Sequence, residues 1–254
     1  MFSQAEAYER FMGRWSHLLA PSLVEFSGIR DGDAVLDVGS GTGQLSFAIR
    51  DATRTARITG IDPSRGYIGY ASAKNQDGRV RFEVGDGQAL SFPDATFDQT
   101  TSLLVMNFIP DPKRALKEMI RVTKPGGVIS AAVWDYGEGM EMLRVFWDEA
   151  AAPERDEKNM PLCKKGELAA LWREGGLADV EETTLETTLR FVSFDDYWEP
   201  LELGQGPAGA YVSTLSPAQR AELAARLKKR LLANGPDGPV EMRARAWAVK
   251  GNRR

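Results

Sequence analysis

Apolar and polar positions alternate in blocks along the first half of the chain. Short runs rich in β-branched and aliphatic residues predict five strands, at 34–38, 57–61, 80–84, 99–105 and 128–133. Helical patterns lie between some of them, at 44–50, 64–74 and 112–122. Strands that alternate with helices predict a mostly parallel sheet with helices on both faces. The expected fold class is therefore α/β.

Two segments interrupt this alternation. The connection GQALSFPDATFD at 87–98, between the third and fourth predicted strands, is less clearly helical than the others. Pro125-Gly126-Gly127 is expected to break the chain where the last of these helices turns into its strand.

The second half has a looser pattern. Helical stretches are expected at 140–151 and 165–174, and the last two strands at about 181–192 and 241–249, with a helical insertion at 195–233 between them. We therefore expect an N-terminal helical segment over residues 1–30 and an α/β core over 31–134. Residues 135–254 are expected to complete the sheet and to carry a helical cap.

The composition of the chain argues against several classes of function. The 254 residues include 32 basic and 36 acidic side chains, for a net charge of −4, so the chain lacks the basic balance typical of a nucleic-acid partner. The basic cluster 226–230 is expected on a solvated helix face, with an anion contact as the alternative. No run approaches the roughly 20 apolar residues of a membrane span. One cysteine and one histidine predict no metal site and a reducing, cytoplasmic location.

The segment VLDVGSGTGQL at 35–45 carries the clearest chemistry. A buried strand is expected to lead into a glycine-rich turn, and the turn to open a helix. Glycines at 39, 41 and 43 permit positive φ angles and a close approach of a ligand to the main chain. The helix N-terminus beyond them offers free N–H groups to an anion. If this segment is considered alone, the alternative to a ligand site is a tight turn that binds no ligand.

Two acidic residues strengthen the ligand interpretation. Asp62 ends the second predicted strand and is placed to accept hydrogen bonds from ribose hydroxyls. Asp86 follows the third and could accept from an adenine amino group. Each alone could be a turn former or a helix cap. Together with the glycine turn, they converge on one crevice at the carboxyl edge of a parallel sheet.

Four segments in this order, VLDVGSGTGQL, ITGIDPS, FEVGDGQALSFPDATFD and LKEMIRVTKPGGVI, resemble the class I S-adenosylmethionine-dependent methyltransferases. The resemblance covers about residues 8–134 and is nearest to the small-molecule, type 11 group that includes ubiquinone and menaquinone biosynthesis enzymes. It implies a Rossmann-like sheet of seven strands with the last antiparallel. It also implies S-adenosyl-L-methionine as cofactor and methyl transfer to a small, hydrophobic or aromatic molecule. The alternative is a catalytically silent protein that binds the cofactor as a sensor.

The resemblance assigns cofactor contacts to particular residues. Gly39, Ser40 and Gly41 match the turn that faces the methionine moiety, and Asp37 matches the acid near its amino group. The remaining matches are to the ribose and adenine contacts and to a carbonyl that receives the ammonium group: Asp62, Pro63, Asp86, Gly87 and Leu104.

The N-terminal segment 8–15 resembles the helix and loop that many of these enzymes fold over the cofactor. It implies that Arg14 pairs with the methionine carboxylate, whose geometry matches a guanidinium. The alternative is a solvated arginine beside a core tryptophan, Trp15. His17 and Asn107 are weak candidates for the catalytic site, and we expect His17 to have a surface or capping role.

Acceptor contacts are expected from the cap and from the ends of the fourth and fifth strands. The candidates are aromatic residues, each of which could instead belong to the core: Phe108, Trp134, Tyr136, Trp198 and Tyr211. A nicotinamide dehydrogenase is disfavoured because position 44 is Gln where G-x-G-x-x-G requires glycine. An amino-directed nucleic-acid methyltransferase is disfavoured by the acidic balance. The sequence does not distinguish a monomer from a homodimer.

Overall fold

A seven-stranded sheet organises the molecule in a computed structural model that describes residues 4–254. The strands are β1 (Ala34–Val38), β2 (Arg57–Asp62), β3 (Val80–Val84), β4 (Phe97–Leu103), β5 (Thr123–Trp134), β6 (Ala178–Phe191) and β7 (Val240–Asn252). They lie in the order β3-β2-β1-β4-β5-β7-β6. β1 to β5 pair in parallel, and β7 is antiparallel to both neighbours. The predicted α/β class and antiparallel closing strand are confirmed.

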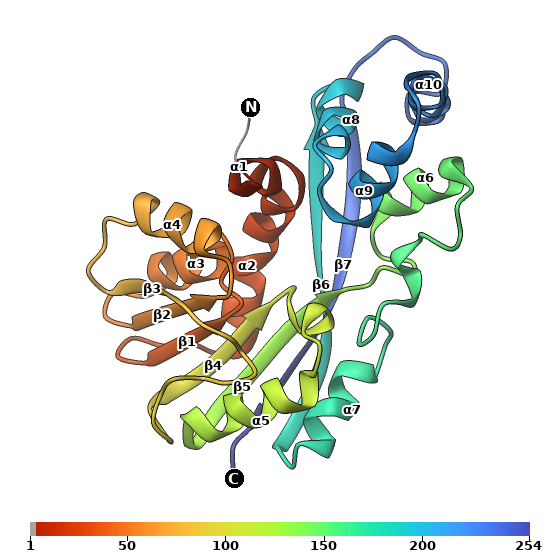
Figure 1. Ribbon diagram of the computed structural model, residues 1–254. Coiled ribbons are helices and arrows are strands. Elements are labelled where there is room, and N and C mark those ends of the chain that lie inside the picture. Colours follow the sequence, from red (N-terminus) through yellow and green to blue (C-terminus); the bar gives the residue numbers. More distant parts are fainter. Residues whose placement is uncertain (1–3) are drawn as a thin grey trace.

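Helices cover both faces of this sheet (Figure 1). Continuous helical chain begins the fold as α1 (Gln4–Tyr8), the π-helix η1 (Glu9–Gly13) and α2 (Arg14–Ser27). α2 lies on the same face as α3 (Gln44–Ala52) and α4 (Arg65–Lys74), and the other face carries α5 (Pro112–Val122) and α7 (Glu167–Glu174). The remaining helices are η2 (Met106–Phe108), α6 (Glu141–Ala150), η3 (Glu157–Asn159), α8 (Phe194–Glu202), α9 (Gly206–Thr214) and α10 (Pro217–Leu232).

Local capping explains why several helices begin where the sequence predicts them. The Ser64 side chain accepts from the Tyr67 N–H at the start of α4, and Asp111 accepts from Arg114 at the start of α5. α10 begins with a capping box, in which Ser216 and Gln219 satisfy each other's backbone N–H groups. These side-chain oxygens accept hydrogen bonds from the N–H groups that the start of a helix leaves unpaired.

The structure corrects the expectation for Pro125-Gly126-Gly127. α5 ends at Val122 and β5 begins at Thr123 and includes these three residues, so they do not break the chain between the helix and its strand. The irregularity is absorbed as a shift in the pairing with β4, between Phe97 and Gln99. Gly126 adopts a φ of +78°, and its N–H donates to the Arg253 carbonyl, so the segment keeps a partner. Between β3 and β4 the chain forms turns in place of a helix.

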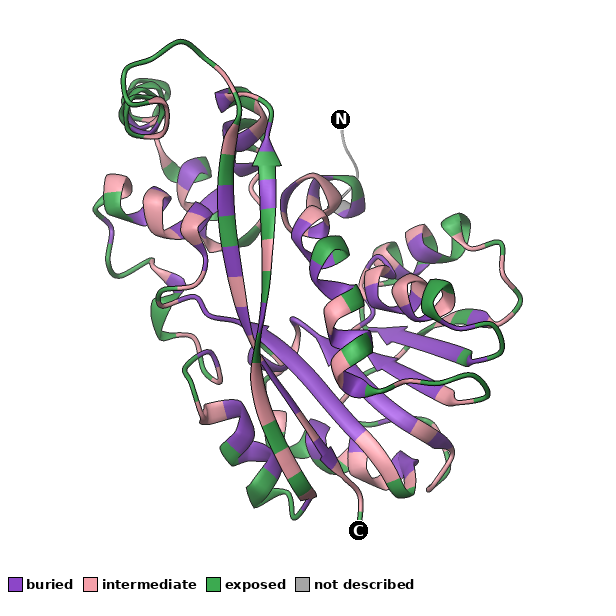
Figure 2. Cartoon of the chain, turned by 180° about the vertical axis from the view of Figure 1, so that it is seen from behind, coloured by how far each residue is buried: buried purple, intermediate pink, exposed green. Residues whose placement is uncertain are grey.

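β6 and β7 extend beyond the rest of the sheet as a two-stranded arm. β5 pairs with β7 only as far as Trp134 opposite Ala246, whereas β6 and β7 remain paired to Phe191 opposite Val240. The arm carries α8, α9 and α10 at its far end (Figures 1 and 2). These three helices of the cap are therefore attached through the last two strands of the sheet, β6 and β7.

Tight packing fastens the N-terminal helix to the sheet and the arm. Trp15 is fully buried, and its ring lies 6.4 Å from that of Trp134 on β5 and 6.2 Å from that of Phe191 on β6. Edge-to-face and tilted ring contacts of this kind stabilise a core beyond the area that they bury. Trp15 is therefore a core residue.

The basic cluster 226–230 links two helices of the cap. Arg226 and Arg230 of α10 both pair with Glu149 of α6, and Arg230 also reaches Asp148. The adjacent face of α10 buries Leu227. Within residues 4–254, no helix has the length and apolar character to cross a membrane. The same residues contain no group of three or more His, Cys, Asp or Glu side chains that could hold a metal ion.

Candidate cofactor and acceptor site

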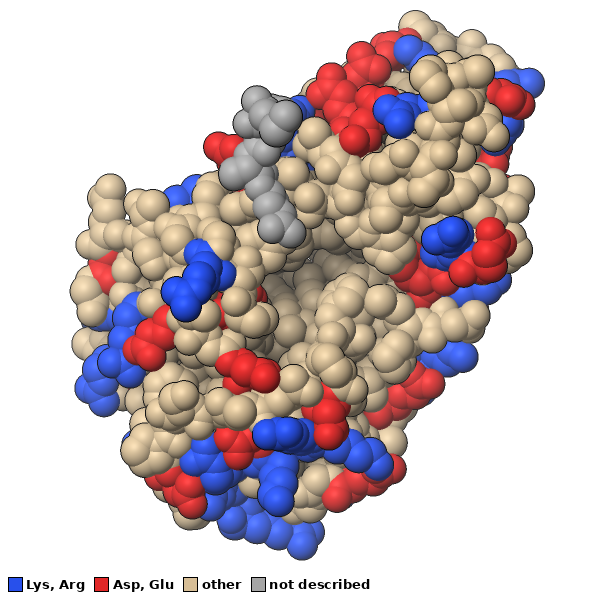
Figure 3. Space-filling model, in the orientation of Figure 1, with Lys and Arg blue, Asp and Glu red and all other residues tan. Residues whose placement is uncertain are grey.

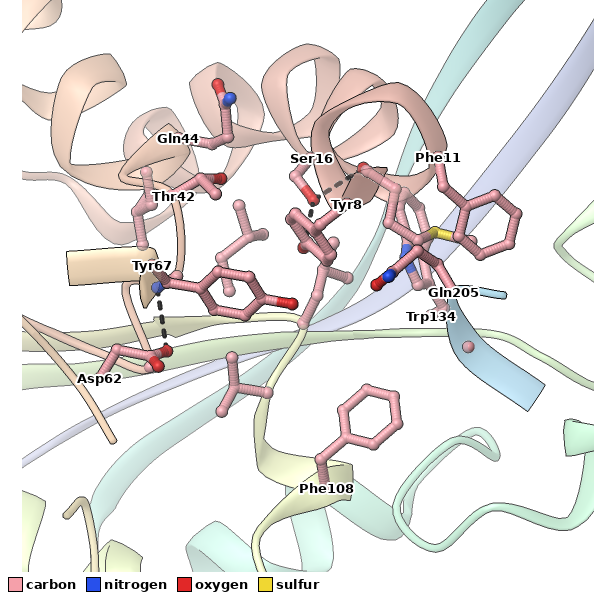
Figure 4. Close-up of a pocket in the computed structure, with 18 of the residues that line it drawn as sticks. Tyr8, Phe11, Ser16, Thr42, Gln44, Asp62, Tyr67, Phe108, Trp134 and Gln205 are labelled. Atoms are coloured by element: carbon pink, nitrogen blue, oxygen red, sulfur yellow. Dashed lines mark hydrogen bonds between the residues drawn. The ribbon is translucent and has the colours of Figure 1, made fainter. Parts of the chain in front are cut away.

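A cavity of about 350 Å³ opens at the carboxyl ends of the central strands. Figure 3 shows the corresponding face hollowed at its centre and bordered mostly by uncharged side chains. Its lining comes from the ends of β1, β2, β4 and β5 and the turns beside them, from the N-terminal helix and α4, and from the cap. In Figure 4, Tyr8 and Ser16 enter from one side, Phe108 from another, Asp62 from the end of β2 and Tyr67 from α4. Parallel sheets place ligand sites at this edge.

The glycine turn after β1 approaches the cavity closely. Gly39 has a φ of +76°, and a Cβ built there would lie 2.4 Å from the Val105 side chain, so only glycine fits. Gly41 has a φ of +52° and has open space where its Cβ would lie. Ser40 is buried, and its Oγ has no hydrogen-bond partner. The turn therefore offers backbone and a free hydroxyl to a ligand.

Among the polar groups beside the glycine turn, Asp37 has the most unusual environment. It is 0% exposed, and its Oδ2 accepts from the Ser46 hydroxyl at 2.7 Å, whereas Oδ1 has no partner. Burial raises the pKa of Asp37 to about 7, and the nearby Asp62 adds to the rise. A buried carboxylate oxygen without a donor is costly, and a cationic ligand group would satisfy it.

Asp62 closes the next strand end and lines the same cavity. Its Oδ2 accepts from the Gly41 N–H at 3.1 Å, and its Oδ1 from the Ser64 N–H at 2.8 Å. Burial raises its pKa, while the two N–H donors oppose the rise. These bonds orient the carboxylate toward the glycine turn, and its remaining lone pairs stay available to a ligand.

Leu104 occupies a strained backbone position just after β4. Its φ is +63°, which is rare for a residue with a branched side chain, and its N–H donates to the Ala132 carbonyl at 2.7 Å. Leu104 lines the cavity. Strain of this kind is often found at ligand sites.

Several of the predicted cofactor residues do not line the cavity. Arg14 instead forms a two-pronged ion pair with Asp196 of α8, at 2.8 and 3.1 Å. Pro63 and Asp86 are exposed, and Asp86 accepts from the Gln88 N–H within its own turn. The turn that contains Asp86 and Gly87 nevertheless adjoins Asp62, because the Gly85 N–H donates to the Asp62 carbonyl.

The aromatic candidates separate into two groups. Phe108, Trp134 and Tyr136 line the cavity, and Phe108 is 52% exposed. Trp198 and Tyr211 do not line it, because they pack inside the cap: Trp198 stacks on Phe194, and Tyr211 contacts the rings of Phe146 and Trp147.

The two weak catalytic candidates also lie outside the cavity lining. His17 lies within hydrogen-bond distance of the Gln44 side chain, 3.2 Å from Nδ1 to Oε1. Asn107 is buried and donates to the Met160 sulfur at 3.4 Å. Both side chains are thus engaged in local contacts.

Other lining residues carry no signal in the sequence, and only the tertiary fold brings them to the cavity. They come from the N-terminal helix, from α4 and from the cap: Phe11, Met12, Ser16, Tyr67, Glu157, and Gln205 to Pro207. No local pattern marks them, since they are spread over several elements that are distant in the sequence. The N-terminal helix is tied to the glycine turn through Glu9, which accepts from Thr42 at 2.5 Å and from Gln44 at 2.8 Å.

Comparison with known proteins decides the family. A model described as a methyltransferase domain matches residues 36–131. Over 178 residues the chain is 30% identical to demethylmenaquinone methyltransferase from Bacillus licheniformis, and the match covers 62% of this chain and 76% of that protein. The chain belongs to the class I S-adenosylmethionine-dependent methyltransferases.

Other similarities agree with membership of this methyltransferase family. The chain is 35% identical over 129 residues to the ubiquinone/menaquinone biosynthesis C-methyltransferase UbiE from Bdellovibrio bacteriovorus, a match that covers 48% of this chain and 52% of that protein. The chain thus spans about half the length of that relative. The YcgJ protein from Bacillus subtilis shares the fold, with a TM-score of 0.63 at 20% identity over 94% of this chain and 99% of that one.

The residues at the cavity fit the cofactor of this methyltransferase family. The unpartnered Asp37 Oδ1 suits an ammonium group, and the open space beside Gly41 suits a chain lying along the turn. No lysine, arginine or histidine occurs among the described residues that line the cavity, whereas Asp37, Asp62 and Glu157 do. An acidic, cation-free cavity favours a positively charged sulfonium.

Proposed function

We propose that this protein binds S-adenosyl-L-methionine in the cavity and transfers its methyl group to a small hydrophobic or aromatic molecule. The observation that carries the proposal is Asp37, a buried carboxylate with one free oxygen beside a glycine turn with open space. Family membership supports the same activity. When bound, the cofactor supplies a methyl group already activated by the positive charge on sulfur.

The chain's own residues hold and orient the reactants in this proposal. Asp37 and the Leu104 carbonyl receive the ammonium group, and Gly39 to Gly41 face the methionine chain. Asp62 accepts from the ribose hydroxyls. The adenine extends past Asp62 toward Pro63 and the turn with Asp86 and Gly87, and the hydrogen bond between Gly85 and Asp62 supports that direction.

The acceptor lies on the other side of the cavity, against the aromatic residues that line it. Phe108, Trp134 and Tyr136 provide an apolar surface there. Holding the acceptor in line with the methyl group is the protein's main contribution, and alignment of this kind lowers a barrier by up to about 7–11 kcal/mol in the best cases. The region 135–254 thereby serves as the acceptor cap.

The N-terminal segment acts as a lid in this proposal. Of the predicted span 1–30, residues 1–3 lie outside the described part of the chain. Within the rest, Tyr8, Phe11 and Met12 line the cavity, and Glu9 ties the helix to Thr42 and Gln44. The π-helical turn at Glu9–Gly13 is a form often found at functional sites. Product release requires this segment to move.

Two measurements on the purified protein test the proposal. Calorimetry with S-adenosylhomocysteine should show binding at one site per chain, and Gly41→Val should abolish it by filling the open space. Incubation with methyl-labelled cofactor and a set of small aromatic acceptors should give labelled product. Binding without transfer to any acceptor would favour the cofactor-binding sensor, and no binding would reject both functions.

A further inference from the structure

Glu157 is a carboxylate of the cavity that the proposed cofactor contacts leave unused. It is 5% exposed and lines the cavity, but it comes from the short helix η3 between α6 and α7, whereas Asp37 and Asp62 come from strand ends. Trp134 and Tyr136 line the same cavity from the end of β5. Glu157 therefore belongs to the half of the cavity that the acceptor occupies in the proposed function.

The segment that carries Glu157 is held in place by one face of α6. Arg144 forms a two-pronged ion pair with Asp156, the residue before Glu157. Trp147, three residues further along the helix, donates its indole N–H to Glu157 Oε2. Residues spaced by three lie on the same helix face, so α6 positions both neighbouring carboxylates. Glu157 is thus anchored through one oxygen by a rigid donor.

Among the described residues, no cation is paired directly with this buried charge. Arg144 is engaged by Asp156, and among the described residues no lysine or arginine forms an ion pair with Glu157. Burial raises the pKa of Glu157, as does Asp156 to a smaller degree, whereas a hydrogen bond from its own backbone N–H, the Trp147 hydrogen bond and the charge of Arg144 lower it. A buried carboxylate without a counter-ion is costly to keep, and such groups are concentrated at functional sites.

The surroundings of Glu157 define the group that it can meet. Burial, and to a smaller degree the neighbouring Cys163 and Glu157, raise the pKa of Tyr136 well above its ordinary value, so this phenol stays neutral. Three carboxylates and no basic side chain occur among the described lining residues. An anionic acceptor would be repelled there, whereas a neutral hydroxyl could donate to Glu157.

We propose that Glu157 is the base that takes the proton from an uncharged, hydroxyl-bearing aromatic acceptor during methyl transfer. The inference rests on the proposed function. The acceptor oxygen forms a bond to the methyl carbon, and the bond from that carbon to sulfur breaks with its electron pair left on sulfur. The hydroxyl proton goes to the Glu157 carboxylate. The positive charge of the sulfonium and the negative charge of Glu157 thereby disappear together.

The first test is a binding comparison with three matched probes. Calorimetry measures the affinity of 4-chlorophenol, 4-chloroanisole and 4-chlorobenzoate for the protein, with and without S-adenosylhomocysteine. We expect the phenol to bind at least about tenfold more tightly than the anisole, which lacks the donor, and the benzoate to bind most weakly. Equal affinity for phenol and anisole, or preferred binding of the benzoate, would overturn the proposal.

Variants assign that preference to one side chain. Glu157→Leu should abolish the discrimination between phenol and anisole. Glu154→Gln removes the same charge from an exposed position on the same segment and should leave the discrimination unchanged. If Glu157→Leu does not fold, Glu157→Gln keeps the shape and an acceptor for the Trp147 N–H, and the transfer measurement below decides.

The second test follows transfer of labelled methyl groups to 4-chlorophenol against pH. Glu157→Gln should lower kcat by about 10²–10⁴-fold with a small change in KM, and Glu157→Asp should restore part of it. At saturating cofactor, so that protonation of Asp37 does not limit binding, the wild-type kcat should fall as the pH drops through the raised pKa of Glu157, and this acidic limb should disappear in Glu157→Gln. Tyr136, Arg144 and Asp156 remain in both proteins, so the lost limb belongs to Glu157.

The outcomes separate this inference from the proposed function. If S-adenosylhomocysteine binds and Glu157→Gln transfers methyl groups at the wild-type rate with the same pH profile, the inference is wrong and the proposed function stands. If S-adenosylhomocysteine does not bind, the proposed function fails. The probe comparison without that ligand then shows whether Glu157 still receives a hydroxyl, and loss of that preference rejects the inference as well.

Discussion

The glycine turn and the cap contribute to one cavity in opposite ways. At the turn, Asp37 and Ser40 keep buried polar atoms without partners. In the cap, Asp156 is paired with Arg144, and the Trp147 indole holds Glu157 through one carboxylate oxygen. Unpaired polar atoms are costly until a ligand meets them, whereas paired ones keep a fixed position without a ligand. The turn is therefore arranged for tight binding of one ligand, and the cap for holding its acidic groups in place beside the acceptor half of the cavity.

The largest effect should come from the turn. Asp37→Asn removes the charge that the ammonium group meets and should weaken S-adenosylhomocysteine at least about a hundredfold, or roughly 3 kcal/mol. Calorimetry measures the loss. Asp51→Asn, an exposed carboxylate on the neighbouring α3, is the control and should bind as the wild type does. Unchanged affinity in Asp37→Asn would contradict the comparison between turn and cap.

The same residue predicts a pH dependence of opposite sign for binding and for stability. The pKa of Asp37 is about 7 in the folded chain, above its ordinary value of 3.8, so the folded state holds the proton more tightly. Without ligand, the free energy of unfolding should therefore rise as the pH falls from above 7 toward 4, through this group. Affinity for S-adenosylhomocysteine should fall over the same range. Denaturant titrations of wild type and Asp37→Asn at pH 5 and 8 isolate this contribution.

Asp62→Ala should have the next largest effect. The ribose hydroxyls would lose their acceptor, and the N–H groups of Gly41 and Ser64 would lose theirs, which loosens the turn. We expect a ten- to hundredfold loss of affinity, about 1–3 kcal/mol. Binding of adenosine and of S-adenosylhomocysteine should weaken together, because both carry the ribose. A loss confined to S-adenosylhomocysteine would place Asp62 elsewhere on the ligand.

Phe108→Ala should affect only the acceptor. The ring is 52% exposed and lines the cavity, so its loss costs little stability and removes apolar surface from the acceptor half. The KM for an aromatic acceptor should rise about tenfold, while the affinity for S-adenosylhomocysteine changes by less than about twofold. Steady-state kinetics gives the KM and calorimetry gives the affinity on the same variant, so together they test whether the acceptor half and the cofactor half of the cavity act separately.

The smallest effect on binding should come from Arg14→Ala. In the structure Arg14 is bound by Asp196 and stacks over Phe191, so it joins the N-terminal helix to the cap. We expect a loss of about 1 kcal/mol of stability and less than about a threefold change in affinity for S-adenosylhomocysteine. A double-mutant cycle with Asp196→Ala measures the pair. A large loss for S-adenosylhomocysteine, with adenosine unaffected, would instead assign Arg14 to the methionine carboxylate.

The sequence alone was sufficient to predict the strand ends that border the cavity. The chain from Leu36 to Gly43 forms a buried strand and a turn whose φ angles require glycine, and Asp62 follows at the next strand. Parallel pairing brings these groups together whatever covers them, because the carboxyl ends of neighbouring strands share an edge. Local periodicity likewise predicted the order of strands and helices, because it depends on near neighbours.

Only the tertiary structure decided the rest of the site. Tyr8, Glu157 and Gln205 line the same cavity although they are far apart in the sequence, because the N-terminal helix, the η3 segment and the helices carried by the β6–β7 arm all lie against the strand ends. The aromatic residues show the same limit: Trp134 and Tyr136 reach the cavity, whereas Trp198 and Tyr211 pack inside the cap. The burial of a side chain depends on which distant element packs against it. Arg14 pairs with Asp196 for the same reason, because the fold brings α8 next to the N-terminal helix.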